Sequence, residues 1–135
     1  MKKKFSLLFI FFCIFSFAQK IHFENESKWF INEFTGNAEI IEGSNSKVKT
    51  TVTLHLDKKI IFVERDVFKN NAYSHSRVNQ YNIIEVIEQE NNLLFKVADL
   101  LYRQYVEIIL AKDDTYLSIS TKCDSKNCPE FDAYY

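Results

Sequence analysis

The chain has 135 residues, a formal net charge of −1, two glycines and one proline. This length allows one hydrophobic core, and the weak net charge argues against a strongly basic nucleic-acid-binding protein. The scarcity of glycine argues against collagen-like, linker-rich and glycine-loop phosphate-binding chains, while a hydrophobic content of 47% argues against disorder.

Residues 1–18 have the pattern of a secretory signal peptide. Three lysines at positions 2–4 precede the apolar run 5–17, and Ser16 and Ala18 place small residues where a signal peptidase reads the chain. The apolar run is too short for a membrane-spanning helix. We therefore predict export to the periplasm or the outside. Cleavage would remove three lysines and no acidic residue, leaving 117 residues with a net charge of −4.

The remaining chain shows the period-two alternation of half-buried strands. Along residues 48–56, Val52 and Leu54 are expected to face the core, and Thr53 and His55 to face water. Short segments of strand character, separated by polar turns, recur through the rest of the chain. The expected strands are residues 28–34, 37–41, 48–56, 60–63, 73–78, 81–88, 93–98, 106–110 and 115–121.

Short strands without a strong helical segment between them favour an all-β fold, either a single antiparallel sandwich or a small barrel of about eight strands. One stretch leaves an alternative open. Leu94, Val97, Leu101, Tyr105 and Ile108 are spaced as on one face of a helix. The alternative is therefore an α+β fold with one helix near residues 93–109.

Two cysteines remain after cleavage, Cys123 and Cys128. An even number of cysteines in an exported chain predicts a disulfide, and a loop this short should contribute about 2 kcal/mol or less. We expect an all-β domain at 19–121 and a C-terminal tail at 122–135 that the disulfide pins. No metal or cofactor is expected, because the three histidines lie far upstream with no paired spacing.

Motifs of catalysis are missing from the sequence. It contains no glycine-rich phosphate loop, paired-histidine metal motif or nucleophile elbow. Glu24 and Glu26 could face the same way, but near a new N-terminus such carboxylates usually lie in water. We therefore expect no enzyme and name no catalytic residues.

Aromatic residues suggest a binding role. Trp29 followed by Thr35-Gly36 resembles the opening of lipocalin-like proteins, although the Gly-x-Trp pattern of that family is absent. Closed sheets of eight strands can hold one small ligand inside. The side chains that we expect to line such a pocket are Trp29, Val52, Leu54, Phe62 and Phe95.

The sequence thus predicts a secreted, non-catalytic β-domain that binds an apolar or amphipathic small molecule. The alternative is an extracytoplasmic protein-interaction or inhibitor module, with an envelope protein as its partner. Residues 131–135 alternate as in the last strand of outer-membrane barrels, but Cys128-Pro129 prevents a strand of sufficient length. We expect neither nucleic-acid binding nor stable membrane insertion, and the oligomeric state stays undetermined.

Overall fold

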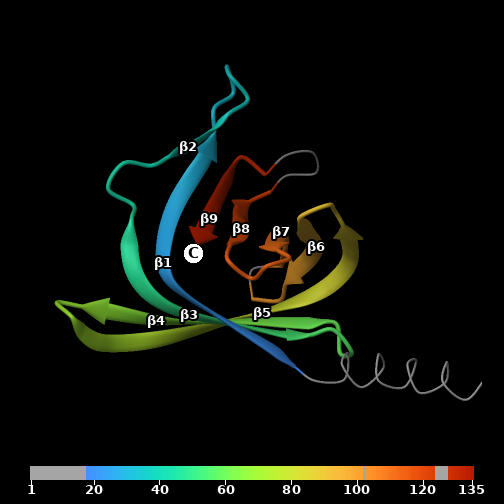
Figure 1. Cartoon of the computed structure of the whole chain (residues 1–135), viewed down its shortest axis with the longest axis horizontal. Helices are drawn as coiled ribbons and strands as arrows, with labels where there is room; N and C mark the ends of the chain where they lie inside the picture. The colour runs from blue at the N-terminus through green and yellow to red at the C-terminus, as the bar shows by residue number, and fades with distance from the viewer. Residues whose placement is uncertain (1–17, 102, 124–127) are drawn as a thin grey trace, which may run out of the picture.

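The computed structural model describes residues 18–101, 103–123 and 128–135. The predicted signal peptide, apart from Ala18, lies outside these residues. Every regular element in the described residues is a β-strand, which confirms the all-β class (Figure 1). The strands are β1 (Gln19–Ile31), β2 (Ala38–Ile40), β3 (Ser46–His55), β4 (Ile60–Lys69), β5 (Ala72–Glu88), β6 (Asn92–Asp99), β7 (Gln104–Ala111), β8 (Leu117–Lys122) and β9 (Glu130–Tyr134).

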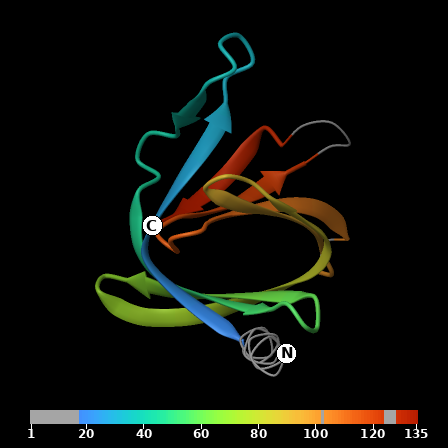
Figure 2. The same cartoon turned by 45° about the vertical axis from the view of Figure 1, so that its right-hand side comes forward.

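These strands form one antiparallel sheet that closes on itself. Their order is β2-β1-β3-β4-β5-β6-β7-β8-β9, and β9 also pairs with β1. The closed barrel therefore consists of eight strands, with β2 as an extra strand beside the end of β1 (Figures 1 and 2). Of the two predicted architectures, the barrel is confirmed and the sandwich is wrong, because the β1–β9 ladder joins the two edges that a sandwich would leave apart.

The core fills the middle of the barrel. Val52 of β3, Ile61 of β4, Ile108 of β7 and Leu117 of β8 have no exposed surface. These side chains come from strands distributed around the ring, and alternate residues on each strand point inward with them. Hydrophobic burial therefore stabilises the central layer, and the open space lies toward the two ends of the barrel.

The predicted alternation of residues 48–56 is confirmed in β3. Val52 and Leu54 are buried, whereas Thr53 and His55 are partly exposed on the other face. The His55 ring meets the ring of Phe62 edge-on with a centroid distance of 5.6 Å.

The strands expected at residues 93–98 and 106–110 are confirmed as β6 and β7, so the alternative of a helix near residues 93–109 is wrong. Leu94 lies opposite Ile109, and Val97 lies opposite Val106, in the antiparallel ladder between β6 and β7. The β-branched residues Val106, Ile108 and Ile109 of β7 suit this ladder better than a helical turn.

Two segments that we expected as separate strands, 73–78 and 81–88, form the single strand β5. The polar residues Asn79 and Gln80 are not a turn, because they lie opposite Val63 and Phe62 in the ladder with β4. A strand this long pairs with β4 along its first part and with β6 along its second part. Asn79 lines a cavity inside the barrel, whereas Gln80, which lies opposite Phe62, is on the other face of the sheet.

A register shift in β1 decides which of its residues enter the barrel. The ladder with β3 shifts between Phe23 and Asn25. Phe23 and Glu26 are consequently both buried, although they are three residues apart and a regular strand would turn them to opposite faces. The bulge therefore directs Glu26 inward, and the expectation that it lies in water is wrong.

The C-terminal segment completes the barrel. The predicted Cys123–Cys128 disulfide is present, with 4.1 Å between the two Cα atoms. Beyond it, β9 pairs with both β8 and β1, and Asn25 and Tyr135 exchange backbone hydrogen bonds of 2.9 and 3.1 Å. The segment that we expected as a tail thus includes a strand with partners on both sides.

Candidate functional site

Two cavities lie at opposite ends of the barrel. One, of about 580 Å³, reaches Leu101 and Gln104 at the connection between β6 and β7. The other, of about 640 Å³, reaches Lys59 in the β3–β4 turn and Lys112 in the β7–β8 turn. Successive connections of an antiparallel barrel alternate between its ends, so these cavities face in opposite directions. Both volumes fall in the range of small-molecule sites.

The first cavity, the polar cup, is lined by three cationic and three carboxylate side chains together with Tyr81, Tyr134 and neutral residues. The charged residues are Glu26, Lys28, Arg65, Arg77, Asp99 and Asp132. The second cavity, the apolar cup, is walled mainly by aliphatic side chains and Phe95. Its apolar residues are Leu56, Ile83, Ile84, Val86, Leu93, Phe95, Leu110 and Ala111.

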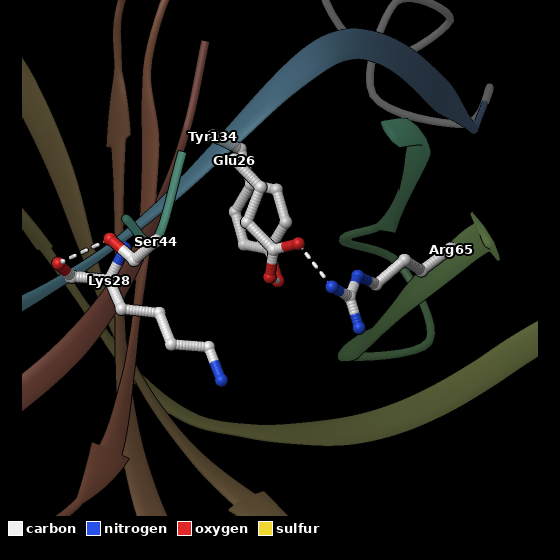
Figure 3. Close-up of polar contacts among 5 residues, drawn as sticks. All are labelled: Glu26, Lys28, Ser44, Arg65 and Tyr134. Atoms are coloured by element: carbon white, nitrogen blue, oxygen red, sulfur yellow. Dashed lines mark hydrogen bonds and ion pairs between the residues drawn. The ribbon is translucent and has the colours of Figure 1, made fainter. Parts of the chain in front are cut away.

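A buried ion pair lies in the polar cup. The carboxylate of Glu26, a residue only 2% exposed, accepts a hydrogen bond from the guanidinium of Arg65, which reaches it from across β3 (Figure 3). The Tyr134 hydroxyl donates to the other Glu26 oxygen at 3.3 Å. A buried carboxylate needs such partners because desolvation penalises its charged form.

Tyr134 and Asp132 alternate along β9 and face into the cup. Burial, followed by the negative charge of Glu26, raises the pKa of the Tyr134 phenol, so this side chain is a neutral donor at physiological pH. Burial also raises the pKa of the Asp132 carboxyl, with Glu26 as the next contribution and Lys28 acting in the opposite direction. The carboxylate of Asp132 is therefore in a poorly compensated environment.

Lys28 is fixed to the wall through its backbone. Its N–H donates to the Ser44 hydroxyl at 3.0 Å, and that hydroxyl donates back to the Lys28 carbonyl at 3.3 Å. Figure 3 shows the Lys28 side chain extending toward the same interior space that Arg65 enters from the other side. The register places Lys28 opposite Asp132 in the β1–β9 ladder.

Arg77 adds a second guanidinium beside Arg65. The two residues lie opposite each other in the β4–β5 ladder and therefore project from the same face of the sheet. In the described part of the chain, Arg77 has no ion-pair partner within 4.0 Å, and the buried Nε of Arg65 has no hydrogen-bond partner. The guanidinium groups of Arg65 and Arg77 thus keep N–H donors free for a ligand after the Glu26 carboxylate has been paired.

The apolar cup presents hydrophobic side chains to solvent. Phe95 is buried, whereas Ile84 and Val86 of β5 are 57% and 47% exposed. The ladder between β5 and β6 shifts its register between Ile83 and Glu85, next to these exposed residues. The arrangement is a concave apolar surface open at one end.

Polar contacts form a rim around that opening. The Lys112 ammonium donates to Glu88 at 2.8 Å, and the Gln19 amide donates to Asp114 at 3.0 Å. The hydrogen bond from Lys112, with its charge, lowers the pKa of the Glu88 carboxyl. Both signs of charge therefore lie at the mouth of the apolar cup.

The structure separates the five residues that we expected to line a ligand pocket. Phe95 lines the apolar cup, and Val52 and Leu54 are buried in the central core without lining either cup. Phe62 lies with His55 on the outer face. Trp29 also lies outside the lumen, beside a shallow apolar groove.

In that groove the Trp29 ring stacks on Phe131 with 6.1 Å between centroids, and its Nε1 donates to Ser27 at 2.8 Å.

Sequence reasoning missed the polar cup. Continuing the alternation of Ile61 and Val63 by one further period places Arg65 on the inner face, so one signal was present. Glu26 had no such signal, because the bulge that turns it inward contains neither glycine nor proline. The convergence of Glu26, Arg65 and Tyr134 requires the closed barrel.

Within the described ranges, no group of three or more histidine, cysteine and acidic residues could hold a metal ion. The same ranges contain no helix long and apolar enough to cross a membrane. Comparison of the chain with protein-family models, with curated proteins and with solved structures found no match. The two cups are therefore the features of the structure that bear on function.

Proposed function

We propose that the protein is a non-catalytic, extracytoplasmic binding protein that takes the apolar part of an amphipathic small molecule into the apolar cup. The observation that carries this proposal is the exposure of Ile84 and Val86 at a concave surface whose wall includes buried Phe95. Exposed apolar side chains that are gathered in a hollow and rimmed by polar ones are typical of ligand sites.

The rim supports an amphipathic ligand. Lys59 and Lys112 could meet an anionic head group, while Glu85 and Glu88 could meet hydroxyl or ammonium groups. An acyl or alkyl tail contributes about 0.8 kcal/mol for each methylene that it buries, so eight methylenes contribute roughly 6 kcal/mol before the cost of association. A dissociation constant in the micromolar range or weaker is expected.

Export is part of the same proposal. It is supported by the leader pattern of residues 1–18 and by the Cys123–Cys128 disulfide, since such bridges persist in oxidising compartments. Purification of the protein from its own host and determination of its N-terminal residue by mass spectrometry tests the predicted cleavage after Ala18. An intact N-terminus on cytoplasmic protein contradicts it.

Displacement of a fluorescent fatty acid tests the binding site. We expect saturable binding to the wild-type protein and at least a tenfold loss of affinity in Val86→Asp, because the carboxylate enters the path of the apolar tail. Ile41→Asp is the matched control, since Ile41 is exposed to a similar degree and lines neither cup. Absence of saturable binding, or equal affinity of the two variants, refutes the proposal.

A protein-interaction role is the second candidate, favoured by Phe34. This side chain is 98% exposed at the tip of the hairpin between β1 and β2. The tip is ordered by Asn32, whose side-chain oxygen accepts from the backbone N–H groups of Phe34 and Thr35 at 2.9 and 3.3 Å. An ordered turn that presents a bare aromatic ring suits insertion into a partner's pocket.

Crosslinking in envelope extract, with Phe34→Ser compared against Glu33→Ser, tests this role. We expect loss of a discrete crosslinked product only for Phe34→Ser. Retention of every product in that variant excludes the tip as the contact.

A further inference from the structure

The polar cup holds two opposite charges that face each other across the barrel. In the ring β1-β3-β4-β5-β6-β7-β8-β9, strands β5 and β9 are four steps apart in both directions. Arg77 lies on β5 and Asp132 on β9, and both line the same cavity. They therefore occupy opposite walls of the cup.

Arg77 and Asp132 do not form an ion pair with each other. In the part of the chain that the structure describes, neither Arg77 nor Asp132 has an ion-pair partner within 4.0 Å. The charges that surround Asp132 are Glu26 and Lys28 on β1, Arg65 on β4 and its own strand neighbour Glu130. A half-buried carboxyl in such a setting gains from a cation that comes close to it.

The charge balance of the cup selects the class of ligand. Its lining has three cationic and three carboxylate side chains. A simple anion could satisfy Arg77 and the free Nε of Arg65 but would add repulsion at Asp132, and a simple cation would do the reverse. A ligand with one charge of each sign matches both walls at once.

We propose that the polar cup binds a small zwitterion, with its carboxylate against the guanidinium groups of Arg77 and Arg65 and its ammonium against the Asp132 carboxylate. Planar guanidinium donors on adjacent strands suit a carboxylate, which accepts two parallel hydrogen bonds. Free amino acids and short peptides with unblocked termini have this chemistry, and the volume of about 580 Å³ accommodates molecules of their size. This site lies at the other end of the barrel from the apolar cup and does not depend on it.

Glycine, glycylglycine and triglycine test the proposal, because they carry the same two terminal charges at increasing separation. Each is titrated into the isotopically labelled protein and binding is followed by NMR chemical shifts. We expect saturable binding, with the highest affinity for the probe whose ammonium and carboxylate are separated by the distance that fits the cup. N-acetyl-glycylglycine and glycylglycine amide each lack one charge, and each should bind at least fivefold more weakly than glycylglycine. Comparison of glycine with glycylglycine and triglycine also shows whether the ligand is a free amino acid or a peptide.

Two pairs of variants locate the contacts. Arg77→Gln should weaken glycylglycine at least fivefold, whereas Arg103→Gln, an exposed cation outside both cups, should not. Asp132→Asn should remove the preference for glycylglycine over its acetylated form, whereas Asp57→Asn should preserve it.

Several results overturn the proposal: no saturable binding of any of the three probes at millimolar concentration, equal affinity for the capped and free peptides, or unchanged binding in Arg77→Gln. NMR resonances of residues in the apolar cup should not shift when the zwitterions are added, so they serve as an internal reference. Binding to the apolar cup is measured separately, with the fluorescent fatty acid. Failure of one cup to bind its probe is therefore distinguishable from failure of the other.

Discussion

Replacing Arg65 with methionine removes the cation that faces Glu26 and keeps much of the length of the side chain. In the wild-type protein the Glu26 side chain is 3% exposed and the Arg65 side chain 29% exposed. The substitution leaves the carboxylate with the Tyr134 hydroxyl, at 3.3 Å, as its remaining side-chain partner among the described residues. A buried charge without its counter-ion is one of the most destabilising single changes in a core.

The expected magnitude follows from this burial. Breaking a fully buried ion pair by removing one partner costs about 3–5 kcal/mol. Arg65 retains contact with water, which screens part of its interaction, so we expect a loss of about 2–3 kcal/mol in the free energy of unfolding. That is a large fraction of the roughly 5–15 kcal/mol that holds a domain of this size folded.

Urea unfolding of the protein, followed by tryptophan fluorescence, measures this loss. Trp29 is the only tryptophan of the chain, and its stacking on Phe131 makes its emission sensitive to unfolding. The double variant Glu26→Gln/Arg65→Met is the decisive comparison, because it removes the orphaned charge. We expect it to recover at least about 1 kcal/mol relative to Arg65→Met.

Unfolding of Arg65→Met at the same urea concentration as the wild type would contradict this expectation, as would a double variant that is no more stable than Arg65→Met. Either result would mean that Glu26 obtains its compensation from water or another group. An unchanged dependence of the unfolding free energy on urea concentration is required for the comparison, since a changed slope indicates a different extent of unfolding.

Further predictions concern the register, the disulfide and Asp132. Leu54→Asp should prevent folding, because it places an unpaired carboxylate in the core, whereas Thr53→Asp should change the thermal midpoint little; equal tolerance in circular dichroism would contradict the register. Replacement of Cys123 and Cys128 by serine should cost about 2 kcal/mol or less and leave the sheet spectrum intact, since backbone pairing on both sides holds β9; loss of the sheet signal would show a larger role. Asp132→Asn should raise the thermal midpoint at pH 7. The raised pKa of this carboxyl means that ionisation destabilises the fold as pH rises through that pKa, so the gain should vanish in acid, and a gain independent of pH would contradict it.

Local pattern was sufficient to predict much of the fold. Alternation in residues 48–56 placed Val52 and Leu54 inside because a strand with one wet face must repeat every two residues. The even number of cysteines left after the predicted cleavage of an exported chain predicted the disulfide. Where a segment's own pattern was ambiguous, as at residues 93–109, the sequence left both a helix and strands open. Pairing between β6 and β7 decided for strands.

The candidate sites depended on contacts between distant parts of the chain. Glu26 enters the barrel because of a bulge in β1, and it meets Arg65, 39 residues further along, only after the sheet has curved. Trp29, which we expected in a ligand pocket, lies outside because it alternates along β1 with Lys28, whose side chain lines the polar cup.

The sequence alone therefore determined the all-β class and the apolar face of strands such as β3, because alternation is a property of neighbouring residues. It did not determine residues 19–27 of β1 or the whole of β9 as strands. Closure of the ring was decided only in three dimensions, through the pairing of β9 with β1. That closure sets Arg77 opposite Asp132 and separates a charged end from an apolar one, because positions around a barrel are fixed by strand order and register together.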